Sequence, residues 1–284
     1  LKVGLTDKKR SITPQLVEEI IGINKDFNNF TIESNNRGVV IFGSCQMLKQ
    51  TSSENAGGRI EINTLYDSNY ISGDTNVNIK NLYKGNVTLK KSGSIVVENC
   101  IGNASYLTTD TGSITVNNAE SDVFARTYSG NIVIDKANNN ISINSSRGTT
   151  TVNFKDDAGD RCLNAETRDG TINVTGVDVL VVKATGNNGS VNAVMNDVKN
   201  GCNIKTIQGN VNIIFKDGDQ FTLYTTQQNG GSFFFEDLET PIPITSIPAD
   251  GKIVVNKDAA NVSFIVTTTQ GGSINIVDKS MASI

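Results

Sequence analysis

Glycine recurs about every 20 residues along most of this chain, and that period limits the fold more than any other feature of the sequence. The turn glycines are Gly38, Gly58, Gly73, Gly93, Gly112, Gly130, Gly148, Gly170, Gly189, Gly209, Gly231, Gly251 and Gly272. Most are followed by a short run that alternates in polarity, such as SITV at 113–116 and SINI at 273–276. Such alternation is typical of a β-strand with one buried side.

A second alternating run precedes the glycine, and it often ends in Thr or Ser three positions before it, as at Thr109, Thr127 and Thr206. Each unit therefore contains two short strands and two turns, which is the signature of a solenoid. We predict an all-β fold, a single parallel β-solenoid (β-helix) of about twelve coils of ~20 residues, with successive coils stacked on one another.

The residues two and four positions after each glycine are predicted to face the core. In the last ten units nineteen of these twenty residues are apolar, among them Phe233 and Phe235, while Phe234 between them is expected to be exposed. An antiparallel meander of hairpins would alternate in the same way. We prefer the solenoid, because hairpins favour two-residue Asn-Gly or Asp-Gly turns and the corner here is longer and variable.

Residues 1–30 do not follow the period, so we predict a separate N-terminal segment and a solenoid domain over 31–284. Thr13-Pro14 is a suitable helix start, since Pro is favoured at the first helical position. The apolar residues of one helical face follow: Leu16, Val17, Ile20 and Ile21. We expect a short amphipathic helix that caps the first coil, because a solenoid needs its open strand edges covered. A helix that docks a partner is the alternative, and the solenoid ends are the expected place of any self-association.

The charge balance argues against a nucleic-acid partner. The chain has 25 Lys and Arg against 29 Asp and Glu, and its only basic run is Lys8-Lys9-Arg10. No stretch approaches the roughly 18 apolar residues that a transmembrane helix needs. The chain opens on Leu1 without a signal-like segment, so we expect a processed product or an excised domain.

Four cysteines, Cys45, Cys100, Cys162 and Cys202, stand far apart and in no C-x-x-C spacing. A zinc site is not expected, because the chain has no histidine and no close cysteine pair. We predict four free thiols. Cys100 is expected at an interior corner, and Cys162 and Cys202 are expected about two coils apart, beyond disulfide reach.

The outward positions three residues after each glycine form the candidate contact face. They carry almost no charge and consist of Val96, Thr115, Val133, Thr151, Asn173, Asn192, Asn212, Phe234, Val254 and Asn275. This surface is either a partner-binding face or a wall of stacked Asn and Thr side chains that hydrogen-bond to one another.

A metal site and a carbohydrate-cleaving site are the two chemical alternatives to this interpretation. Carboxylates gather at the first corner, as at Asp156, Asp157 and Asp197, but interleaved lysines compete and no GGxGxD repeat is present, so no metal site is predicted. A polysaccharide-cleaving β-helix would place Asp clusters on a sheet face, and the contact face has none. Without histidine, Ser-His and Cys-His nucleophile pairs cannot form. We predict no catalytic residue and no cofactor.

The pattern Ser/Thr-x-x-Gly-Ser/Asn-Ile-x-Val at this period, over about residues 31–276, resembles the head-GIN adhesin-like β-solenoid families of bacteria. The resemblance implies a surface-associated parallel β-helical domain and supplies no catalytic residues.

Two function classes remain open. The first is an extracellular or cell-surface solenoid for adhesion or scaffolding, with a protein or a surface glycan as partner. The second is an intracellular or organellar structural subunit docked in a larger assembly, which the unpaired cysteines favour mildly.

Overall fold

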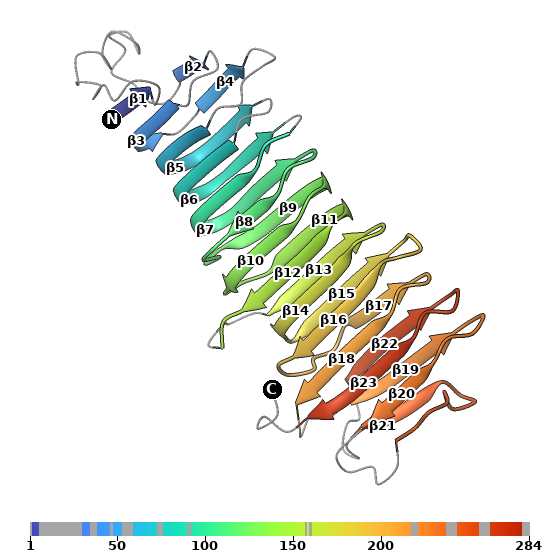
Figure 1. Cartoon of the computed structure of the whole chain (residues 1–284). Coiled ribbons are helices and arrows are strands. Elements are labelled where there is room, and N and C mark those ends of the chain that lie inside the picture. Colours follow the sequence, from blue (N-terminus) through green and yellow to red (C-terminus); the bar gives the residue numbers. More distant parts are fainter. Residues whose placement is uncertain are drawn as a thin grey trace. The chain divides into compact units, whose positions relative to one another are not determined.

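The computed structural model describes residues 2–5, 30–34, 39–45, 48–52, 59–72, 76–89, 92–156, 158, 161–216, 221–236, 243–255 and 262–279, with side chains from Asn76 onward. These residues form β-strands joined by turns and contain no helix (Figure 1). The helix predicted over 14–21 lies outside them. The chain divides into two compact units, 1–136 and 137–284, and each is described by itself.

The first unit contains two parallel ladders, which correspond to the two strands of each predicted coil. Its strands are β1 (Lys2–Leu5), β2 (Phe30–Ser34), β3 (Val39–Cys45), β4 (Leu48–Ser52), β5 (Arg59–Ser72), β6 (Asn76–Leu89), β7 (Ile95–Thr109), β8 (Ile114–Val116), β9 (Asp122–Ser129) and β10 (Ile132–Ala137). The first ladder runs β3–β5–β6–β7–β8–β10. The second runs β2–β4–β5–β6–β7–β9.

Strands β5, β6 and β7 belong to both ladders, because each continues around the corner of its coil. Positive φ angles at Lys84 (50°) in β6 and Gly102 (97°) in β7 mark these corners. Strand β1, which lies in the predicted N-terminal segment, pairs in the antiparallel direction with β3 of the predicted solenoid domain, which the sequence did not indicate.

The second unit repeats the two-ladder arrangement. Its strands are β11 (Ile141–Arg147), β12 (Thr149–Phe154), β13 (Cys162–Thr167), β14 (Thr171–Val177), β15 (Val179–Ala184), β16 (Ser190–Met195), β17 (Cys202–Thr206), β18 (Val211–Lys216), β19 (Phe221–Gln227), β20 (Phe233–Glu236), β21 (Lys252–Val255), β22 (Ser263–Thr268) and β23 (Ile274–Lys279). The first ladder runs β12–β14–β16–β18–β23–β20. The second runs β11–β13–β15–β17–β22–β19.

The last coil of the chain lies inside the stack, not at its end. Figure 1 shows β22 and β23, in red, between β17 and β18 on one side and β19 and β20 on the other. The expectation that the coils follow one another in sequence order is therefore wrong at this end. The period defines which residues face inward, but any coil with that pattern satisfies the hydrogen bonds of a neighbouring coil equally well.

Strand β21 corrects a second expectation. Its residues were predicted to continue the first ladder, but they pair in the antiparallel direction with β19 of the second ladder, with Phe221 opposite Val255 and Leu223 opposite Ile253. An antiparallel bridge between Phe235 and Ile244 also forms next to β20. These two contacts bring residues 244–255 back against the coil of β19 and β20, which lies at the end of the stack. Its free strand edges would otherwise be able to pair with another chain.

The predicted inward positions are buried in both units. The interior of the second unit contains a cluster of phenylalanine rings. The ring of Phe215 lies 5.2 Å from that of Phe221 and 6.3 Å from that of Phe235, and Phe221 lies 5.8 Å from Phe264. Residues from β18, β19, β20 and β22 thus share one core, although they are far apart in sequence.

The threonine that stands three positions before several of the turn glycines has a structural role. Its buried hydroxyl donates to a glycine carbonyl oxygen, at 2.9 Å from Thr109 to Gly93 and at 3.0 Å from Thr127 to Gly112. The glycines of neighbouring coils approach so closely that a Cβ atom on Gly209 would overlap the carbonyl oxygen of Gly189. Gly272 stands in the same relation to Gly209, as expected for the inserted coil.

We expect Gly209→Ala to lower the free energy of unfolding by about 3 kcal/mol, because the coil spacing must widen to admit one methyl group. Gly230→Ala is the control, since its φ is +92° but nothing lies within 4 Å of the added carbon. It should cost only the backbone strain, about 1–2 kcal/mol. Urea denaturation of both variants measures the difference, and equal losses would show that close packing of the coils is not the reason for glycine.

Candidate interaction faces

The outer side of the first ladder, called here the first face, contains nine of the ten predicted contact residues. In the first unit Val96, Thr115 and Val133 are neighbours in register. In the second unit the order is Thr151, Asn173, Asn192, Asn212, Asn275 and Phe234. Val254 is the exception: it lies on β21 opposite Thr222, so it does not belong to this row.

The asparagines of the first face bond to one another. Asn192 Nδ2 donates to Asn173 Oδ1 and Asn212 Nδ2 donates to Asn192 Oδ1, each at 2.8 Å. Phe234 is half-buried where the sequence suggested full exposure, whereas Phe233 and Phe235 are buried as predicted. These hydrogen bonds satisfy part of the polar groups of the row within the chain, as expected if its side chains stack and bond to one another.

The large apolar side chains that are most exposed lie elsewhere. Among the described residues six are between 37% and 51% exposed: Tyr106, Phe124, Tyr128, Tyr224, Val254 and Ile265. In each unit they lie on the outer side of the second ladder or, in the second unit, on β21, which pairs with it; this side of each unit is called here its second face. Sequence analysis missed it. The signal was present, because these residues alternate with inward residues of the second run such as Leu107 and Val123.

Each unit has its own group of these residues. In the first unit Tyr106 of β7 lies opposite Phe124 of β9, and their rings stack with centroids 4.6 Å apart and planes 9° from parallel. In the second unit Tyr224 of β19 lies opposite Ile265 of β22. Aromatic side chains are enriched at protein interfaces, so the second face is the stronger candidate for partner contact.

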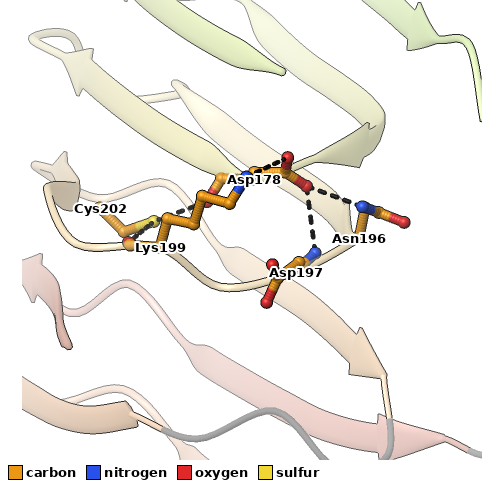
Figure 2. Close-up of polar contacts among 5 residues, drawn as sticks. All are labelled: Asp178, Asn196, Asp197, Lys199 and Cys202. Atoms are coloured by element: carbon orange, nitrogen blue, oxygen red, sulfur yellow. Dashed lines mark hydrogen bonds and ion pairs between the residues drawn. The ribbon is translucent and has the colours of Figure 1, made fainter. Parts of the chain in front are cut away.

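A polar cluster organises one corner of the second unit (Figure 2). Asp178, between β14 and β15, is 4% exposed. Its carboxylate accepts hydrogen bonds from the side chain of Asn196 (2.9 Å) and the backbone N–H of Asp197 (3.2 Å), and forms an ion pair with Lys199 (3.2 Å). The thiol of Cys202 lies 3.5 Å from the carbonyl oxygen of Asp178. All these contacts join the 178 corner to the turn before β17, so the cluster acts as a structural clamp.

Asp178→Ala should lower the free energy of unfolding by about 3 kcal/mol, because it leaves buried donors and a cation without their acceptor. Asp197→Ala is a matched control, since the Asp197 side chain is exposed and only its backbone takes part. Chemical denaturation compares the two. If both variants lose the same stability, the clamp contributes nothing measurable.

Comparison with known protein families identifies the family to which this chain belongs. Residues 19–175 match the family model described as Toastrack DUF4097, which is more than half of the chain. The chain belongs to the Toastrack DUF4097 family. Searches among curated proteins and solved structures give no match.

The Toastrack match supports the β-solenoid prediction and does not point to the head-GIN adhesin-like families in particular. It ends at residue 175, so the Asp178 clamp and the inserted coil lie beyond the matched region. Among the described residues, no helix is long and apolar enough to cross a membrane.

The thiols of this Toastrack chain follow the predicted pattern where the structure describes them. Among the described residues, Cys100, Cys162 and Cys202 form no disulfide; the side chain of Cys45 lies outside these residues. Cys100 is fully buried at a corner, and its backbone forms an isolated parallel β-bridge with Ala119 in the next coil. Burial raises the pKa of Cys100 to about 12 and that of Cys202 to about 11, from an ordinary value of 9.0.

Because the folded pKa of Cys100 is raised, the unfolded chain loses this proton first, and stability falls as the pH rises from about 9 toward 12. At pH 10 we expect this thiol to reduce the free energy of unfolding by about 1.4 kcal/mol relative to pH 8. Urea unfolding of wild type and Cys100→Ala at both pH values measures it. A pH-dependent loss that is the same in both proteins would contradict the assignment.

Proposed function

We propose that this Toastrack chain is a non-enzymatic β-solenoid that acts by contact with other molecules, as an adhesion or interaction module at the cell surface or in secreted form. The observation that carries this proposal is that, within each unit, the most exposed large apolar residues lie together on the second face of that unit. Exposed apolar residues scattered singly need no explanation, whereas neighbouring ones, such as Tyr106 with Phe124 and Tyr224 with Ile265, mark an interaction surface.

Three further points support a non-enzymatic role. The chain has no histidine, so the commonest general base is absent. The central outward positions of the first face carry no carboxylate, unlike the faces on which polysaccharide-cleaving chemistry would rest. The raised pKa values of Cys100 and Cys202 keep both thiols protonated, which does not suit a nucleophile.

The test compares surface binding by variants of the two faces. Purified protein, labelled at its N-terminus, is applied to intact cells of the source organism, and bound fraction is measured against concentration. A Tyr224→Ser/Ile265→Ser variant should lose at least tenfold in apparent affinity, while Asn192→Ser, on the first face, should keep it. Loss with the Asn192 variant alone would move the contact to the first face, where all the predicted contact residues except Val254 lie.

A second candidate is an intracellular structural subunit docked in a larger assembly. The absence of a disulfide among the three described cysteines favours it, since disulfides are rare in reducing compartments. Protease treatment of intact cells separates the two candidates. Degradation of the protein by external protease supports the surface module, and full protection together with sedimentation in a large complex supports the subunit.

A further inference from the structure

The aromatic group of the first unit contains a cation without a partner. On the outer side of β9 the side chains follow in the order Phe124, Arg126 and Tyr128, and Tyr106 of β7 stacks against Phe124. All four are exposed. Among the described residues, the guanidinium of Arg126 makes no hydrogen bond or ion pair, and neither do the hydroxyls of the two tyrosines.

The spacing of this row matches an extended polypeptide. Alternate residues of a strand point to the same side about 6.8 Å apart. Phe124, Arg126 and Tyr128 therefore stand at the distances that separate side chains i, i+2 and i+4 of an extended partner segment. Aromatic residues and arginine are the residue types that most often dominate the binding energy at interfaces.

We propose that this row binds an extended polypeptide segment with the pattern apolar-x-acidic-x-apolar, whose central carboxylate pairs with Arg126 while its apolar side chains pack on Phe124 and Tyr128. This inference rests on the proposed interaction function and names its partner chemistry in the first unit. A planar guanidinium binds a carboxylate through two parallel hydrogen bonds, which gives both strength and orientation.

The geometry favours a polypeptide over a sugar. Sugars stack on the open faces of aromatic rings, but Tyr106 and Phe124 each have one face covered by the other. Asp122 and the exposed Asp110 lie near the two ends of the row, so a partner with one central carboxylate fits better than a polyacidic run.

The experiment is selection from a phage-displayed library of random 12-residue peptides on the immobilised full chain. We expect enrichment of apolar-x-acidic-x-apolar sequences. An enriched peptide, made synthetically and labelled with fluorescein, should bind Arg126→Glu at least tenfold more weakly in a polarisation assay. Selection on Arg126→Glu should favour a basic central residue instead, because the charge at the centre of the row is reversed.

Lys205→Glu is the matched control. Lys205 occupies the position in β17 that Arg126 has in β9, one residue before the buried threonine, but Asn203 stands where Phe124 would be. The control should leave peptide binding unchanged. No enrichment of the pattern, or equal loss in both variants, overturns the proposal. So does binding to anionic lipid vesicles or to a glycan array that depends on Arg126 while the peptides do not bind. If the peptides fail but the Tyr224/Ile265 variant still loses cell binding, the general interaction function stands without this site.

Discussion

Removal of residues 262–284 is expected to unfold the end of the second unit, not merely to shorten the solenoid by one coil. In the structure β22 joins β17 to β19, and β23 joins β18 to β20. Without them the strands on either side would be two strand spacings apart, about 9.6 Å, and their facing backbone groups would have no partners.

The expected loss in the free energy of unfolding follows from the side chains that the inserted coil buries. Phe264, Val266, Ile274 and Ile276 are at most 1% exposed. Burial of each contributes about 1.5–3 kcal/mol, so the four together are comparable with the whole stability of an ordinary domain, about 5–15 kcal/mol. The truncated chain should therefore lose the structure of residues 221–255 as well.

Hydrogen exchange followed by mass spectrometry measures this result. Amides of β19, β20 and β21 should exchange fast in the truncated chain, and those of β12 to β16 should stay protected. A truncation that ends at Lys279 is the control, because it keeps both strands of the inserted coil. A synthetic peptide of residues 262–279 should restore protection when added in trans. Retained protection of 221–236 without the peptide would contradict the observed order of coils.

Phe235→Ala is expected to lower the free energy of unfolding by about 3–5 kcal/mol, the usual range for a buried phenylalanine. Phe235 is 1% exposed, and its ring lies 6.3 Å from that of Phe215 on β18, across the inserted strand β23. Its removal therefore weakens the contact between coils on both sides of β23.

The neighbouring residue is the control. Phe234→Ser changes a half-buried side chain of the first face beside Asn275, and it should cost about 1 kcal/mol or less. Urea denaturation with a far-UV probe gives both values. Equal destabilisation by the two substitutions would mean that the alternation of buried and exposed residues is misassigned in β20.

Most of the fold was accessible from sequence, because strand alternation and the glycine period are local. Ile114 and Val116 are buried around Thr115 for a reason that a short window of sequence contains: side chains alternate across a strand. The turn glycine and the threonine before it are also local, since the same close approach recurs at Gly112, Gly170 and Gly209. The corner position of Cys100 beside Ala119 followed from the same period.

The interaction faces were less accessible. The sequence correctly placed Asn173, Asn192 and Asn212 in one row but left open whether this row binds a partner or bonds to itself, and the coordinates show that the amides bond to each other. The exposed group around Tyr106 and Phe124 depends on two strands meeting in register, with their rings in contact. Outward residues are under no burial constraint. The alternation therefore predicts which positions face outward, but not which of these positions carry neighbouring aromatic side chains.

The sequence by itself determined that this chain forms an all-β solenoid, which residues face its interior, and where its turns lie. Only the tertiary structure decided that the coil of residues 262–279 lies between two earlier ones, that Lys252–Val255 runs antiparallel at the end, and that exposed aromatics gather on the second face. The physical reason is that burial is set within each strand, whereas the choice of neighbour is set between strands. Every coil here offers the same backbone edge and the same apolar interior, so the local pattern is compatible with several orders, and the packing of rings such as Phe215, Phe221 and Phe264 selects among them.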